Sequence, residues 1–241
     1  MGSFYESARI VRAHGKAPPL AGVVSNGDCS EATTVSCPSL AAFLSVHGNR
    51  RRRLTERHNQ TRIQEAIVTN DPLARFGEVP QFSLTSSDMT DGGPLRSAQY
   101  GADAGGADVS PQLSWRGFPA ETLSFALTVF DPDAPTGSGF WHWAVANLPV
   151  SVTGLSAGVQ SLPAGSLVLP NELRLTSFSG AAPPPETGTH RYQFIVHALD
   201  VPTLDLDPQS TPGVLGFNLH FHTLARAVLE ATGVAGGASA A

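Results

Sequence analysis

One stretch constrains the fold more than any other, an apolar run that ends in Asp131-Pro-Asp-Ala-Pro135. Large apolar residues occupy alternate positions from Leu123 to Val129, and this period of two predicts a strand over residues 122–131 with one buried face. Asp131 falls on that face. A buried carboxylate needs a partner, because burying it alone costs several kcal/mol. The two prolines end the strand and remove backbone donors, so a ligand site is expected at this stiff corner.

Several shorter segments also have strand character, and Pro and Gly residues separate them. Their spacing predicts a mainly β fold rather than repeated strand–helix units. Near the C-terminus, apolar residues at spacings of three to five over residues 214–231 predict an amphipathic helix that packs against the β core and stops at Gly233. The strands are predicted at residues 82–86, 112–115, 122–131, 140–148 and 192–199.

Charge divides the chain into two unequal parts. Residues 1–70 carry nine Lys/Arg and five Asp/Glu, whereas residues 71–241 carry six and fifteen and contain no lysine. The first part shows no sustained periodicity, and its run of four arginines is interpreted as a solvated surface feature. We therefore predict a poorly ordered basic N-terminal extension at 1–74, a folded domain at 75–235 and a flexible tail at 236–241. Within the extension, short helices are conceivable at 40–46 and 54–68.

The composition also excludes several classes of partner. An acidic, lysine-free domain is a poor candidate for attachment to nucleic acid or to anionic membranes, and no apolar run approaches the ~20 residues that span a bilayer. The N-terminus lacks the pattern of a secretory signal, so a cytoplasmic location is expected. Cys29 and Cys37 are interpreted as free thiols, and they supply too few ligands for zinc. We expect no metal or cofactor.

Two histidines stand at comparable places in other strands. His190 precedes the strand that starts at Tyr192 and shares its inward parity, while Arg191 falls on the opposite face. His142 lies between two tryptophans in the 140–148 strand, where the period does not decide which face is buried. Taken alone, His142 is explained as a packed core residue and Asp131-Pro-Asp-Ala-Pro135 as a turn, and only their combination with His190 suggests a site.

Three ordered segments resemble the phosphatidylethanolamine-binding protein family, and more closely its bacterial, Raf-kinase-inhibitor-like branch. They are Leu127-Thr-Val-Phe-Asp-Pro-Asp-Ala-Pro135, the Trp141-His142 strand that ends in Ala146-Asn147-Leu148-Pro149, and Gly188-Thr-His-Arg-Tyr192. The likeness covers about residues 78–232. It implies an antiparallel β core with peripheral strands and C-terminal helices. It also implies a small pocket that binds phosphate or the phosphoryl head group of phosphatidylethanolamine.

The resemblance assigns a ligand pocket to particular positions. The histidines would donate to the anion and Asp131 would orient them, while Asp133 is expected to cap the turn; Ala182 stands where some members have a cysteine. With no lysine in the domain, the histidines and backbone amides are the expected donors, so binding should weaken as pH rises through the histidine pKa values. The pocket residues carried over are Asp131, Asp133, Pro135, His142, His190, Tyr192 and Phe178.

Two other functions stay open. The Asp/His cluster could serve a metal-assisted or acid–base enzyme, although the chain lacks the Gly-x-Ser-x-Gly, His-Glu-x-x-His and Walker patterns. The resemblance also makes inhibition or modulation of a kinase or protease credible, without an identifiable inhibitory loop. His220 and His222 diverge on a helix at their spacing, so we interpret them as ordinary surface and packing residues.

Overall fold

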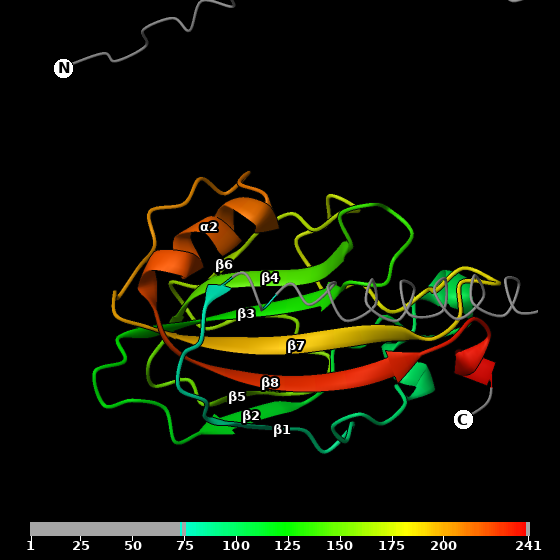
Figure 1. Ribbon diagram of the computed structural model, residues 1–241, viewed down its shortest axis with the longest axis horizontal. Helices are drawn as coiled ribbons and strands as arrows, with labels where there is room; N and C mark the ends of the chain where they lie inside the picture. Colours follow the sequence, from blue (N-terminus) through cyan, green and yellow to red (C-terminus); the bar gives the residue numbers. More distant parts are fainter. Residues whose placement is uncertain (1–72, 74–75, 240–241) are drawn as a thin grey trace, which may run out of the picture. The chain divides into compact units, whose positions relative to one another are not determined.

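A computed structural model of the chain describes residue 73 and residues 76–239 (Figure 1). The helices considered at 40–46 and 54–68, the arginine run and both cysteines lie outside the described residues. Within the described part, no helix is long and apolar enough to cross a membrane.

The described chain is mainly β, as predicted, and the five predicted strands correspond to β1, β2, β3, β4 and β7. One α-helix and three short 3-10 helices accompany the strands in the described residues. The last 3-10 helix, η4, lies in the expected C-terminal tail, and its residue Ala238 is buried. The elements in chain order are β1 (Ser83–Thr85), η2 (Ser97–Gln99), η3 (Ala102–Ala104), β2 (Leu113–Arg116), β3 (Ser124–Asp131), β4 (Phe140–Pro149), β5 (Gly154–Leu155), β6 (Leu167–Val168), β7 (His190–Leu199), α2 (Pro212–His222), β8 (Thr223–Gly233) and η4 (Gly237–Ser239).

The strands form two antiparallel sheets. The larger has the order β6-β4-β3-β7-β8 and the smaller the order β1-β2-β5. In Figure 1 the smaller sheet lies on one side of the larger sheet and α2 on the other. The larger sheet is therefore the middle of three layers, and its central strand β3 lies between β4 and β7.

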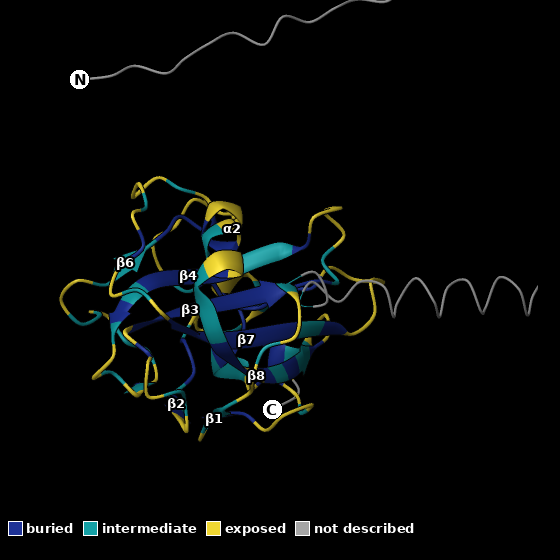
Figure 2. Ribbon diagram, turned by 60° about the vertical axis from the view of Figure 1, so that its left-hand side comes forward, coloured by how far each residue is buried: buried dark blue, intermediate teal, exposed yellow. Residues whose placement is uncertain are grey.

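Two apolar clusters fill the spaces between these layers. The cluster that faces the smaller sheet includes Phe125, Leu127 and Trp115, and the cluster under α2 includes Ala126 and Leu215. Figure 2 shows the strands of the larger sheet largely buried, whereas α2 exposes its outer surface.

The expectation of one buried face for the central strand was wrong. All eight residues of β3 are buried, while the large residue Leu123 just before it is 48% exposed. The reason is that the second face is also covered, since Ala126 packs in the cluster under α2 and its neighbours Ser124 and Thr128 are buried as well. Ser124 satisfies its hydroxyl with the carbonyl of Val201 at 2.6 Å, so burial costs it no hydrogen bond.

The C-terminal helix was correctly expected but wrongly bounded. Thr211 caps the helix, since its side chain accepts from the backbone N–H of Val214, and Pro212 stands in the first turn, where proline is favoured. The helix ends at His222, and residues 223–231, predicted to continue it, form most of β8 instead. This strand pairs antiparallel with β7 from one end to the other, which satisfies backbone groups that β7 would otherwise leave unpaired.

Candidate functional site

Three neighbouring strands bring the predicted polar side chains to one end of the larger sheet. Asp131 ends β3, His190 begins β7, and His142 is the third residue of β4. Their exposed fractions are 3%, 0% and 5%. The cluster therefore lies in the protein interior, where hydrogen-bond partners and not bulk water determine the protonation of these groups.

Asp131 and His190 form the centre of the cluster. The Oδ2 atom of Asp131 lies 2.7 Å from Nδ1 of His190, and Nε2 of His190 lies 2.8 Å from the hydroxyl of Thr187. That hydroxyl donates its single proton to the carbonyl of Pro184 at 2.7 Å. Both ring nitrogens of His190 therefore already contact protein groups, Nδ1 the carboxylate and Nε2 the hydroxyl.

His142 faces the cluster with different contacts. Its Nδ1 lies 2.9 Å from the carbonyl oxygen of Ser179, which can only accept, so Nδ1 carries the proton. Burial lowers the pKa of His142, and the contact with the Ser179 carbonyl and the charge of Asp131 oppose that effect only in part. Nε2 of His142 is therefore a bare acceptor, and it is buried without a hydrogen-bond partner.

Tyr192 adds a second unsatisfied atom. Its ring lies edge-on to the ring of His142, with 5.2 Å between centroids, and its hydroxyl is buried without a partner. Burial, together with the negative charge of Asp131, raises the pKa of Tyr192, so the phenol keeps its proton. The site thus holds an unused acceptor and an unused donor on adjacent rings.

Asp133 does not cap the turn as expected. Asp131 takes that role, since its Oδ1 accepts from the backbone N–H of Asp133 at 2.8 Å. The carboxylate of Asp133 instead binds the guanidinium of Arg191 through two bonds of 2.8 Å. Burial alone would raise the pKa of Asp133, but the hydrogen bonds and charge of Arg191 outweigh it and hold the pKa below its usual value.

Two predicted residues lie outside the cluster. Pro135 is exposed in the loop after β3. Phe178 packs edge-on against Trp143, with 6.0 Å between ring centroids, and lines a separate cavity of about 300 Å³ that includes none of the clustered residues.

Sequence reasoning missed the loop residues that hold the cluster in place. The hydroxyl of Thr187 is hydrogen-bonded to Nε2 of His190. The side-chain amide of Asn171 donates to the carbonyl oxygen of His142 at 3.3 Å. Asp108 accepts from the backbone N–H of Gly180 at 2.7 Å, which fixes the loop behind His142. These residues lie in loops, where no period signals orientation; for Thr187 the only signal is its place three residues before His190.

The described residues contain no group of three or more His, Cys, Asp or Glu side chains that could hold a metal ion. What the cluster offers is hydrogen bonding in a buried setting: one carboxylate–imidazole contact, a second imidazole with an unpartnered Nε2 and one phenol. Such a set suits a small polar ligand that both donates and accepts.

Comparisons with known proteins identify the family of the chain. The model of a family described as phosphatidylethanolamine-binding protein matches residues 85–234. UPF0098 protein YbhB of Escherichia coli (strain K12) is 44% identical over 154 residues, which are 61% of this chain and 97% of that protein. The crystal structure of Escherichia coli YbcL, described as a new member of the mammalian PEBP family, is 36% identical with a TM-score of 0.60, over 63% of this chain and 97% of the other. The structure of CT736, a phosphatidylethanolamine-binding protein homolog from Chlamydia trachomatis, is 30% identical with a TM-score of 0.56. The match covers 64% of this chain and 97% of the other. The chain belongs to the phosphatidylethanolamine-binding protein family.

Proposed function

We propose that this protein binds a small phosphorylated ligand, inorganic phosphate or a phosphoryl head group, at Asp131, His142, His190 and Tyr192. The observation that carries the proposal is the pair of buried atoms without partners, Nε2 of His142 and the hydroxyl of Tyr192. Each unsatisfied buried group costs about 1–3 kcal/mol, and a ligand that meets both would recover that cost.

A singly protonated phosphate matches these groups. Its O–H can donate to the neutral Nε2 of His142, and its other oxygens can accept from the hydroxyl of Tyr192. This changes the expectation that both histidines donate to the anion, because Thr187 already occupies Nε2 of His190. His190 would contact the ligand when a ligand oxygen replaces the hydroxyl of Thr187.

The pH dependence follows from His142. Its pKa is lowered in the free protein, and an anion beside Nε2 would favour the protonated ring and raise that pKa in the complex. Affinity should therefore be highest at acidic pH and fall as pH rises through the pKa of the complex. Sulfate has no proton to donate at these pH values, so its binding should depend on protonated His142 more strongly than that of phosphate.

The test is a calorimetric titration of the full chain with inorganic phosphate, O-phosphorylethanolamine and sulfate between mildly acidic and alkaline pH. His142→Ala should abolish saturable binding, and Tyr192→Phe should weaken it roughly tenfold through loss of one hydrogen bond to a charged group. His222→Ala removes an exposed histidine paired with Asp200 and serves as control. Unchanged affinity in His142→Ala, or equal losses in the control, would exclude the site.

One observation favours catalysis as a second candidate. Asp131, His190 and Thr187 form a carboxylate–imidazole–hydroxyl chain of the kind that activates a nucleophile. The hydroxyl of Thr187 donates to Pro184, however, so its proton is not held by the imidazole. Labelling with a fluorophosphonate decides between the two: modification that is lost in Thr187→Val supports catalysis, and absence of labelling alongside phosphate binding supports a binding protein.

A further inference from the structure

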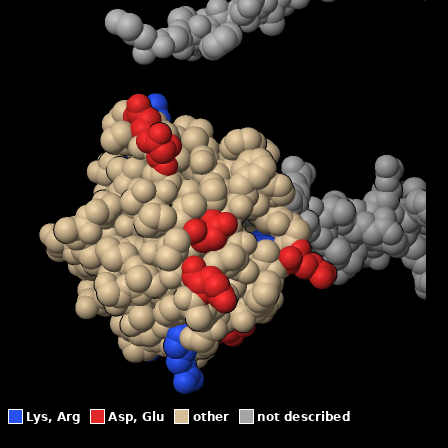
Figure 3. Space-filling model, turned by 90° about the vertical axis from the view of Figure 1, so that its left-hand side faces the viewer, with Lys and Arg blue, Asp and Glu red and all other residues tan. Residues whose placement is uncertain are grey.

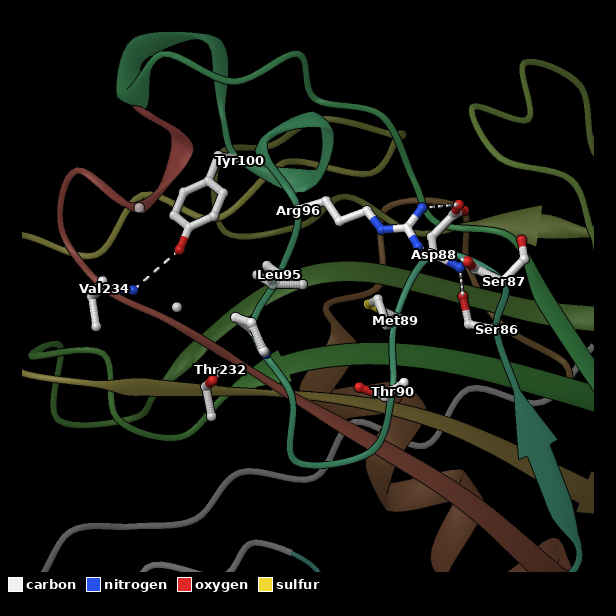
Figure 4. A pocket seen from close by; sticks show the side chains of 13 residues that line it. Ser86, Ser87, Asp88, Met89, Thr90, Leu95, Arg96, Tyr100, Thr232 and Val234 are labelled. Carbon is white, nitrogen blue, oxygen red and sulfur yellow. Dashed lines mark hydrogen bonds and ion pairs between the residues drawn. The ribbon is translucent and has the colours of Figure 1, made fainter. Parts of the chain in front are cut away.

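A second cavity lies under the loop 86–96 at the C-terminal end of β8, and its lining includes Gly233, which pairs with His190 and lies against the ring of Tyr192 (Figure 4). Its volume is about 570 Å³, within the ~300–1,000 Å³ typical of small-molecule sites. Asp131, His142, His190 and Tyr192 are absent from its lining. The lining comes mainly from the loop, with Tyr100, β8 and η4 closing the other side.

Backbone bonds hold the walls of this cavity in place. Leu95 donates to the carbonyl of Thr232 and Thr232 donates to that of Gly93, both at 2.8 Å. At the other end of the loop, the carboxylate of Asp88 accepts from the backbone N–H of Gln112 at 2.7 Å. The loop is thus tied to β8 and to the start of β2, so the cavity is preformed and a ligand need not pay for ordering its walls.

The lining is apolar inside and carries the ion pair of Arg96 with Asp88 at its rim. Met89, Leu95 and the ring of Tyr100 are buried and supply the apolar surface. The hydroxyl of Tyr100 accepts from the backbone N–H of Val234 at 3.2 Å and keeps its own proton to donate (Figure 4).

Arg96 supplies the positive charge. Its side chain is 61% exposed and reaches Asp88 at 3.4 Å and the carbonyl of Ser87 at 3.0 Å. These contacts use two of the five N–H donors of a guanidinium, and the planar fork that remains matches a carboxylate. Residues 71–241 contain six arginines and no lysine, and of these Arg96 lines the cavity.

We propose that this cavity binds a small amphipathic carboxylate, with its apolar body against Met89, Leu95 and Tyr100 and its carboxylate at Arg96. The apolar lining rejects a bare phosphate ion, which distinguishes this site from the Asp/His cluster. The carboxylate gains charge-assisted hydrogen bonds at the rim while its chain leaves water.

The test uses octanoate as probe and amide NMR spectra of the full chain. Octanoate should cause saturable shifts at Thr232 and at Val234, whose N–H bonds to Tyr100. Octanol should bind roughly tenfold more weakly, and Arg96→Gln should weaken octanoate by a similar factor while leaving octanol nearly unchanged, because only the charge-assisted bonds are lost. Inorganic phosphate should not displace octanoate from this cavity.

A matched pair of variants localises the binding. Thr90→Trp places a bulky ring at the exposed edge of the cavity and should block octanoate, whereas Thr85→Trp alters an exposed threonine on β1 outside the lining and should not. Absence of saturable shifts, equal affinity for octanol and octanoate, or full octanoate binding by Thr90→Trp would each overturn the proposal, independently of phosphate binding at the Asp/His cluster.

Discussion

A single extra residue in β4 directs His142 toward the site. Val129 on β3 pairs with Trp143, but the next residue, Phe130, pairs with Trp141, so His142 is inserted without a partner of its own. A bulge of this kind redirects the side chain away from strict alternation, and such bulges are common beside functional sites. The ring thereby contacts Tyr192 on β7 instead of continuing the alternating pattern of its strand.

The bulged residue depends on Asn171 for its position. The side-chain amide of Asn171 lies 3.3 Å from the carbonyl of His142 and 3.2 Å from that of Ser177, and its oxygen accepts from the N–H groups of Leu173 and Leu175. Asn171→Ala removes a buried side chain that bonds to all four groups, although the carbonyl of His142 keeps its bond from the backbone N–H of Ser179. We expect a loss of about 2–4 kcal/mol in the free energy of unfolding, measured with urea, and weaker phosphate binding.

The control for this variant is Asn218→Ala. Asn218 lies on α2 and its amide donates to the carbonyl of Val214 at 2.9 Å, an exposed bond within one helix. Because alanine favours helix, this change should alter stability by less than about 0.5 kcal/mol. Similar losses in both variants would mean that Asn171 has no special role in holding the site.

For single residues, the sequence predicted the side-chain directions that follow from strand alternation. The inward parity of Asp131 and His190 was confirmed, since both are buried and bonded to each other. The face of His142 could not be predicted, because a bulge depends on the partner strand and not on the local period. Thr187 and Asn171 could not be predicted because they act from loops, through contacts that fold only with the complete chain.

Among the elements, the junction of α2 and β8 departs most from the sequence prediction. The apolar spacing over residues 214–231 fits a helix, yet from Thr223 onward the buried apolar residues alternate, with Ala225, Ala227 and Leu229 in the core. Both periods are present in one apolar segment, and short apolar runs do not distinguish them. Pairing with β7 decides the outcome, because the sheet gains a fifth strand only when this segment is extended.

This boundary gives a test in two adjacent residues. Leu229 is 5% exposed and Val228 is 37% exposed, as expected for opposite faces of a strand. Leu229→Ala should lower the free energy of unfolding by about 2–4 kcal/mol through the cavity it leaves, and Val228→Ala by less than about 1 kcal/mol. Equal losses of unfolding free energy in the two variants would contradict the alternation and favour the original prediction of a helix.

For the molecule as a whole, the mainly β class and the antiparallel core were predictable because strand patterns and their resemblance to a family pointed to the same answer. The layer order was not, since the small residues on one face of β3 gave no sign that α2 covers them. Figure 3 shows a face on which charged side chains are sparse and mostly acidic. This agrees with the small number of charged residues in 71–241, of which six are basic and fifteen acidic.

One buried titratable group, the imidazole of His197, is important for stability. His197 on β7 is buried between layers, with Nδ1 3.2 Å from the hydroxyl of Thr223 and its ring 6.5 Å from that of Phe76. Burial, with a smaller contribution from the positive charge of Arg226, lowers the pKa of His197 from 6.5 to about 3. The folded protein therefore holds this ring neutral over a pH range in which the unfolded chain protonates it.

The sign of the effect follows by linkage. Between pH 6.5 and about 3 the unfolded state binds one more proton at this position, so the contribution to stability is complete above pH 6.5 and is lost as pH falls through that window. In His197→Gln the free energy of unfolding should change with pH less steeply, by up to about 1.4 kcal/mol per pH unit near pH 4–5. Leu229→Ala, which removes only packing, should lower the whole curve and keep its slope. If urea unfolding across this range gave His197→Gln and the parent chain the same slope, His197 would have to be protonated inside the fold, and the neutral interior between these layers would be disproved.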